Sequence, residues 1–281
     1  MSTPGRGGRL LPTYRILGPL EIDTGAGRID SASPRRKAVI AALLLEANAP
    51  VSVDRLIEAV WDDDAPATAR NQLQNCVSRA RKELAGIGLP GALATRPPGY
   101  LMSVEEGELD LHVFEWTLGE ARRAAGSDRL HEAAALYEEA LSLWRGTPLA
   151  DVTGRLIRTC AERLTGRRLG ALEERVACEL ALNRHRLLVE ELEAHAAEHP
   201  MRESLQAMLM TALQGSGRRA EALEIYRRTR VRLVEELGIE PGEELRTLHR
   251  TILRDGDVSA VASRMPAARR ILPVRCRSTA R

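Results

Sequence analysis

The sequence predicts a mainly helical protein in two parts: an N-terminal winged helix-turn-helix of mixed α and β structure, followed by an all-α domain of tetratricopeptide type. Aromatic residues make up only 3% of the 281 residues, against 44% hydrophobic and 28% charged residues, so the core must be aliphatic, which favours helices. The first hundred residues contain short strand signals, three helix signals and a hairpin signal. From Leu109 onward, the apolar spacing is helical almost without interruption.

The predicted winged helix occupies residues 13–106 and begins with a small sheet and two helices. Short strands are expected at Tyr14–Leu17 and Leu20–Asp23, and Gly25 to Ile29 fits a turn into a third strand. Ser33 as a cap and Pro34 in the first turn predict the start of the first helix, whose aliphatic run ends at Ala47. Ser52 predicts the cap of the second helix.

A longer, more polar helix and a hairpin complete this part. Residues 68–85 predict the third helix. Residues 93–96 and 100–104 flank Pro97-Pro98-Gly99 as the two strands of a hairpin flank their turn. Two helices joined by a short loop, a third helix and a trailing hairpin describe a winged helix-turn-helix.

The second part, residues 107–256, contains a faint internal repeat. Residues 129–137 and 218–226 match in their Arg, Glu-Ala and aliphatic-Tyr positions. Small residues and a tyrosine at this spacing are typical of paired, stacked helices of tetratricopeptide type. We therefore expect Tyr137 and Tyr226 to be largely buried between helices.

Charge is distributed unevenly along the chain. Residues 1–102 carry 13 Lys/Arg and 10 Asp/Glu, whereas residues 103–257 carry 22 Arg and 29 acidic residues. Residues 258–281 carry six Arg and no acidic residue. We expect residues 1–12 and 257–281 to be disordered. The polar segment Val104–Leu109 is the expected junction between two halves with different partners. The basic half is expected to bind DNA, and the acidic half to offer its surface to protein. A fragment that ends near Gly107 is expected to fold.

The third helix carries most of the residues that we expect to contact DNA. One side is an apolar stripe, and the opposite side displays polar and basic residues: Gln74, Asn75, Ser78, Arg79, Arg81 and Lys82. Ser78 and Arg79 are expected to contact DNA, and Gln74 or Asn75 to set base preference, because such side chains can hydrogen-bond to base edges or neutralise phosphates. A solvated helix face would show the same pattern, but the adjoining hairpin favours the DNA-binding interpretation.

Two further basic positions extend this candidate interface. Arg35 and Arg36 begin the first helix beside Lys37, where cations oppose the helix dipole and a bound phosphate would relieve the repulsion. Solubilising charge explains that cluster equally well. Arg96, at the hairpin tip, is placed to enter a minor groove or contact a phosphate.

Signals of enzymatic activity are absent from the sequence. It contains none of the phosphate-binding, dinucleotide-binding, nucleophile-elbow or zinc-protease motifs. His195 and His199 have a spacing that could bind a metal, but no third ligand accompanies them, so a surface helix is the favoured interpretation. We expect no catalytic residue, no cofactor and no metal. We expect a cytoplasmic protein without a membrane span. In that compartment the four cysteines are expected to be free thiols: Cys76, Cys160, Cys178 and Cys276.

Several motifs, in the same order along the chain, resemble one known family. In the first part these are Gly18-Pro19-Leu20-Glu21, Arg35-Arg36-Lys37-Ala38, Val53-Asp54-Arg55-Leu56, Val60-Trp61, Val77-Ser78-Arg79 and Thr95-Arg96-Pro97-Pro98-Gly99-Tyr100. In the second part they are Asp110, Phe114, Leu143-Trp144-Arg145-Gly146, Glu198-His199-Pro200, Glu221-Ala222-Leu223-Glu224-Ile225-Tyr226 and Leu237-Gly238-Ile239-Glu240-Pro241-Gly242. Together they resemble the Streptomyces antibiotic regulatory proteins, in which an OmpR-type winged helix precedes a bacterial transcriptional activation domain.

The resemblance implies a pathway-specific transcriptional activator of a secondary-metabolite gene cluster. It implies double-stranded DNA as a partner, bound at direct repeats beside a promoter by a homodimer, with recruitment of the RNA polymerase holoenzyme. The alternative is a helical-repeat adaptor whose winged helix binds protein instead of DNA. Retention on DNA-cellulose that falls steeply with salt would distinguish the two, because phosphate contacts require that dependence.

Overall fold

The computed structural model describes residues 13–29 and 33–254, and the expected disordered ends lie outside these residues. The described chain is mainly helical, with an N-terminal winged helix and an all-helical region after it, as predicted. Its contacts divide it into two compact units. The first contains the residues up to 116 together with 140–168, and the second contains residues 117–139 together with those from 169 onward. The division falls inside three helices, α4 (Asp110–Gly126), α5 (Leu130–Leu141) and α6 (Arg155–Ala181). The expected boundary between residues 106 and 107 stays a prediction.

A three-stranded antiparallel sheet begins the first unit. Its strands follow each other in sequence order and are shorter than expected: β1 (Tyr14–Arg15), β2 (Glu21–Asp23) and β3 (Arg28–Ile29). Tyr14 lies opposite Ile22, and both side chains are buried. The alternation of buried and half-exposed residues along β2 directs one face of this sheet into the core.

Three helices follow: α1 (Pro34–Leu45), α2 (Val53–Trp61) and α3 (Ala69–Gly86). Every residue of α1 from Ala38 to Leu45 is buried, because α2 and α3 both pack against this helix. The Ser52 side chain accepts a hydrogen bond from the Arg55 backbone N–H at 3.2 Å, so the predicted cap of α2 is confirmed. Ser33 occupies the N-cap position of α1 and Pro34 its first turn, as predicted, but the Ser33 side chain accepts no capping hydrogen bond.

A second sheet contains the wing, which is the hairpin of β5 (Leu93–Arg96) and β6 (Gly99–Met102). A strand that the sequence did not indicate, β4 (Val51–Ser52), pairs with β6, so the order is β4-β6-β5. Gly99 makes this pairing possible, since a Cβ atom there would lie 2.0 Å from the Val51 carbonyl oxygen. The wing is thereby joined to the start of α2.

A segment from the helical part of the chain is hydrogen-bonded to the winged helix within the first unit. The Arg145 and Leu149 backbone amides donate to the carbonyl oxygens of Leu17 and Gly18, at 2.8 and 2.6 Å. The Leu20 amide in turn donates to the Asp151 carboxylate at 2.7 Å. The first unit therefore includes the connection between α5 (Leu130–Leu141) and α6 as an integral part.

The Asp110 carboxylate holds the first strand from the start of α4. Both of its oxygens accept from the Ile16 amide, and one also accepts from the Leu17 amide, each at 2.9 Å. Only 1% of Asp110 is exposed. Burial raises its pKa to about 6, against the lowering effect of these two amides and of Arg145.

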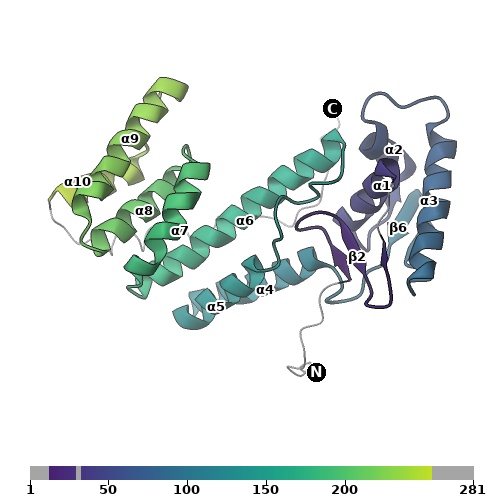
Figure 1. The fold of residues 1–281 in the computed structure, drawn as a ribbon, viewed down its shortest axis with the longest axis horizontal. Coiled ribbons are helices and arrows are strands. Elements are labelled where there is room, and N and C mark those ends of the chain that lie inside the picture. Colours follow the sequence, from purple (N-terminus) through teal and green to yellow (C-terminus); the bar gives the residue numbers. More distant parts are fainter. Residues whose placement is uncertain (1–12, 30–32, 255–281) are drawn as a thin grey trace. The chain divides into compact units, whose positions relative to one another are not determined.

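The C-terminal helices of the second unit pack around one buried helix. They are α7 (His185–Glu198), α8 (Glu203–Gly215), α9 (Arg219–Leu237) and α10 (Glu243–Leu253). All residues of α8 from Leu205 to Leu213 are buried, because α7, α9 and α10 each contact this helix. Figure 1 shows the four helices stacked side by side.

The two repeat tyrosines differ in environment. Tyr137 is 2% exposed, as predicted. Burial and the neighbouring Glu174 raise the pKa of its phenol. Tyr226 is less buried than Tyr137, and its ring stacks on His249 of α10, with ring centroids 3.8 Å apart.

The cysteines correct another expectation. Cys76 and Cys178 are free, as predicted, but Cys160 is disulfide-bonded. Cys276 lies outside the described residues. In the described residues, no helix is both long and apolar enough to cross a membrane, and no group of three metal-ligating side chains occurs.

Candidate nucleic-acid interface

Helix α3 is fixed to the first unit by one apolar stripe. Leu73, Val77, Ala80 and Leu84 are each at most 1% exposed, as their spacing predicts, and they pack toward α1 and α2. The rotation of the helix is therefore determined, and its opposite face must point outward.

The outward face of α3 displays five of the predicted residues. Gln74, Asn75, Ser78, Arg79 and Lys82 are all exposed. Within the described part of the chain, none of these side chains has a hydrogen-bond or ion-pair partner, so their donors and acceptors are available to a ligand. Asn71 is a further exposed polar residue on this face, one turn before Asn75. Asn71 is not among the predicted residues, although its spacing from Asn75 and Ser78 places it on the same face of the helix.

Arg81 differs from these residues because it is bound to the wing. Its Nε donates to the Leu93 carbonyl oxygen at 2.8 Å, and its Nη2 donates to the Thr95 hydroxyl at 2.7 Å. The guanidinium also lies 5.7 Å from the centre of the Tyr100 ring. Arg81 thus positions β5 against α3, and the structure does not place it with the five free side chains.

The basic cluster at the start of α1 is likewise engaged within the protein. Arg35 donates to the Gln72 side chain at 2.9 Å and lies over the Trp61 ring at 5.5 Å. Arg36 forms an ion pair with Glu83 at 3.2 Å, and Lys37 contacts Asp151 at 2.6 Å. The repulsion between these cations and the helix dipole is therefore relieved by protein groups, without a phosphate.

Arg96 lies where the sequence predicts it, at the end of β5 beside the Pro97-Pro98 turn. It is exposed, and no hydrogen bond or ion pair of its side chain occurs among the described residues. The Val53 amide donates to the Pro98 carbonyl oxygen at 3.4 Å, which ties the turn to α2. Arg96 and the five residues of α3 are the free members of the predicted set, and we call these six the interface residues.

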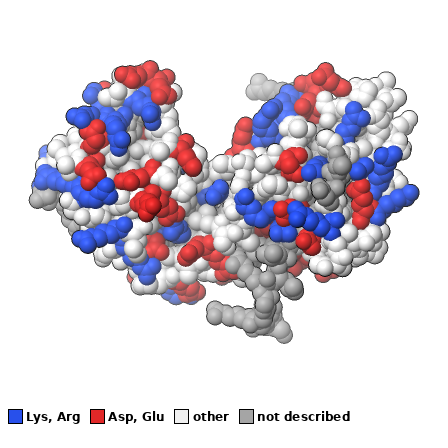
Figure 2. All heavy atoms as spheres, in the orientation of Figure 1, with Lys and Arg blue, Asp and Glu red and all other residues white. Residues whose placement is uncertain are grey.

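The Cys76 thiol of α3 lies near three arginines, two from α1 and one from α3. Burial raises the pKa of the Cys76 thiol, against the lowering effect of Arg36, Arg35 and Arg79. Basic and acidic side chains are interspersed over the face of the molecule drawn in Figure 2.

The chemistry of the interface residues suits the edges and backbone of a duplex. Side-chain amides pair with adenine, guanidinium groups pair with guanine or phosphate, and ammonium groups neutralise phosphates. An α-helix with one face free fits the major groove, while an adjoining hairpin tip reaches the minor groove or the backbone.

Comparison with known proteins agrees with this arrangement. Residues 31–102 match the family described as "Transcriptional regulatory protein, C terminal", and residues 109–253 match the "Bacterial transcriptional activator domain". The solved structure of "Mycobacterium tuberculosis EmbR in complex with low affinity phosphopeptide" superposes with a TM-score of 0.85 at 36% identity, over 91% of this chain and 68% of that one.

Relatives in sequence span both matched regions. "Transcriptional regulatory protein EmbR" of Mycobacterium tuberculosis is 37% identical over 89% of this chain, which spans 65% of that relative's length. "Regulatory protein AfsR" of Streptomyces coelicolor is 37% identical over 86% of this chain and 24% of its own length. "Regulatory protein DnrI" of Streptomyces peucetius is 36% identical over 90% of this chain and 96% of its own. The chain belongs to the family of Streptomyces antibiotic regulatory proteins.

Proposed function

We propose that this regulator is a sequence-specific DNA-binding activator that reads the major groove through α3. The observation that carries the proposal is the outward face of α3, where amide, hydroxyl and basic side chains are exposed and unpaired among the described residues. Ser78 and Arg79 contact DNA, Gln74 or Asn75 sets base preference, and Lys82 and Arg96 contact phosphates or the minor groove. Arg35, Arg36 and Arg81 act indirectly, because each is held by protein groups.

The finer proposal concerns the site and the outcome of binding. We propose a homodimer on direct repeats beside a promoter, recruitment of the RNA polymerase holoenzyme by the helical half, and control of a secondary-metabolite cluster from the cytoplasm. The match to the activator domain and the similarity to a relative of nearly the same length support this view. The proposal includes no cofactor and no metal.

A footprint on the DNA around the protein's own gene tests the proposal directly. We expect protection of two repeats on the same face of the duplex, with a binding constant that falls steeply as salt rises. Run-off transcription with purified polymerase then tests activation on the same fragment. Absence of protection at any salt concentration would contradict DNA binding and favour the adaptor alternative.

A further inference from the structure

A groove in the second unit offers a binding surface that DNA recognition does not use. It encloses about 1010 Å³ between α7 and α9, over α8. Its floor is apolar: Leu209 and Leu213 are each 1% exposed, and Ile225 is 7% exposed. A helix about 10 Å across, rising 1.5 Å per residue, would fill this volume with roughly nine residues.

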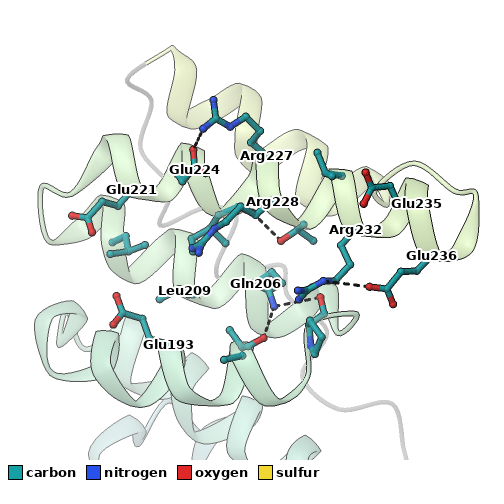
Figure 3. Close-up of a pocket in the computed structure, with 17 residues that line it drawn as sticks. Glu193, Gln206, Leu209, Glu221, Glu224, Arg227, Arg228, Arg232, Glu235 and Glu236 are labelled. Carbon is teal, nitrogen blue, oxygen red and sulfur yellow. Dashed lines mark hydrogen bonds and ion pairs between the residues drawn. The ribbon is translucent and has the colours of Figure 1, made fainter.

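The charges along the groove follow a simple order (Figure 3). Arg228 and Arg232 extend from α9 into its middle, close to Gln206 of α8. Glu193 and Glu221 lie at one end, and Glu235 and Glu236 lie at the other. Glu193 and Glu221 both pair with Arg218, and Glu236 pairs with Arg232. Two carboxylates therefore face one guanidinium at each end, which leaves both ends anionic on balance, and the middle is cationic through Arg228.

Arg228 is the cation available to a partner. Arg227 pairs with Glu224, and Arg232 lies 3.4 Å from Glu236. No ion pair or hydrogen bond of the exposed Arg228 side chain occurs among the described residues. A carboxylate placed in the middle of the groove would therefore find a guanidinium that no acidic side chain already occupies.

From this order of charges we propose that the groove binds a short amphipathic helix of another protein, with one acidic residue at its centre and basic residues at both ends. Its apolar side would rest on Leu209, Leu213 and Ile225, as helices do in apolar grooves. The chain's own residues 258–281 do not fit this pattern, because they contain six Arg and no acidic residue to meet Arg228. This inference rests on the proposed function in one respect: both assign a protein partner to the helical half of the chain.

The test is selection of random 12-residue peptides, displayed on phage, against the full chain. We expect the enriched peptides to place Asp or Glu near the middle and Lys or Arg near both ends. With Arg228→Glu as bait, the central preference should switch to Lys or Arg. Enriched peptides without a positional charge preference, or with the same preference for both baits, would overturn the proposal.

Binding of one selected peptide, measured by fluorescence anisotropy, gives the magnitude. We expect Arg228→Glu to weaken it about ten- to a hundredfold, because a charge-assisted contact is replaced by repulsion. Arg186→Glu, an equal charge change at an exposed position of α7 outside the groove, should leave affinity unchanged. The same peptide with its central acid replaced by Arg should bind Arg228→Glu and not the wild type. Equal affinity of both proteins for the original peptide would overturn the proposal.

DNA binding of the same variants separates this inference from the proposed function. Arg228→Glu should retain wild-type affinity for the footprinted DNA, because Arg228 lies in the second unit and the interface residues lie in the first. If the wild type selects peptides but binds no DNA, the groove proposal stands and the proposed function fails. If it binds DNA but selects no patterned peptide, the groove proposal alone is overturned.

Discussion

Arg79 and Arg81 are two positions apart on α3, yet their side chains have different surroundings. Arg79 is exposed and has no partner among the described residues, whereas Arg81 holds the wing through Leu93 and Thr95. We expect Arg79→Ala to cost roughly 1–3 kcal/mol of specific DNA binding and to relax preference at one base position. Gel-shift titration against single-base variants of the site measures both effects. Unchanged affinity would remove Arg79 from the readout.

The matched change at Arg81 distinguishes contact from positioning. Arg81→Ala removes two hydrogen bonds to the wing, so we expect a lower midpoint of thermal unfolding, whereas Arg79→Ala should melt like the wild type. Arg81→Ala should weaken DNA binding equally for all base sequences, because Arg81 positions the wing and reads no base.

Salt dependence separates the free cations from the paired ones. Lys82 is exposed and unpaired among the described residues, so we expect Lys82→Ala to reduce the slope of log K against log salt concentration by about one. Arg36 already pairs with Glu83, and Arg36→Ala should leave the slope nearly unchanged. Binding measured at four or more salt concentrations checks this. A wild-type slope in Lys82→Ala, or a reduced slope in Arg36→Ala, would reverse the assignment.

At the scale of elements, the two repeat tyrosines should contribute unequally to stability. Tyr137 is 2% exposed, so Tyr137→Ala should lower the free energy of unfolding by roughly 3–5 kcal/mol. Tyr226 is half-buried, and one face of its ring stacks on His249. Tyr226→Ala should therefore lower the free energy of unfolding by clearly less than Tyr137→Ala does. Thermal or denaturant unfolding of both variants gives the comparison. Equal losses would show that the stacked pair stabilises the protein as much as a buried ring does.

The junction between β1 and α4 depends on one carboxylate. Asp110→Asn replaces an acceptor with an amide N–H that faces the Ile16 and Leu17 donors, and should lower the free energy of unfolding by about 1–3 kcal/mol.

The pKa of Asp110 is raised from 3.8 to about 6 in the folded protein, so the folded state binds more protons between these values. The contribution of Asp110 to the free energy of unfolding therefore falls as pH rises from about 4 to about 6, and then stays constant. Urea unfolding at several pH values should show this fall in the wild type and its absence in Asp110→Asn.

At the scale of the whole molecule, the contacts change what we expect of fragments. A fragment of residues 1–107 lacks Asp110, Arg145, Leu149 and Asp151, which bind the first strands in the full chain. We now expect it to unfold at a lower temperature than a fragment of residues 1–168, which contains the whole first unit. Thermal melts of the two fragments test this. Equal midpoints would restore the boundary near Gly107 as the end of an independent folding unit.

Local patterns predicted what depends on neighbouring residues in the chain. The cap at Ser52, the buried stripe of α3 and its polar face all follow from spacing of three or four residues. The sequence could not reveal β4 or the role of Arg81, because both depend on where the hairpin folds back. The bond between Leu20 and Asp151 joins positions 131 residues apart, and neither residue indicates its partner by type or spacing.

That long-range attachment determines how parts of related regulators can be exchanged. A chimera made with one crossover near residue 107 would combine β1 from one parent with Asp110 and Asp151 from the other, and would depend on both parents having compatible hydrogen bonds there. A graft that transfers residues up to 116 and also residues 140–168 carries both sides of every such bond. New DNA specificities are therefore best engineered into this protein by transplanting two stretches of sequence together.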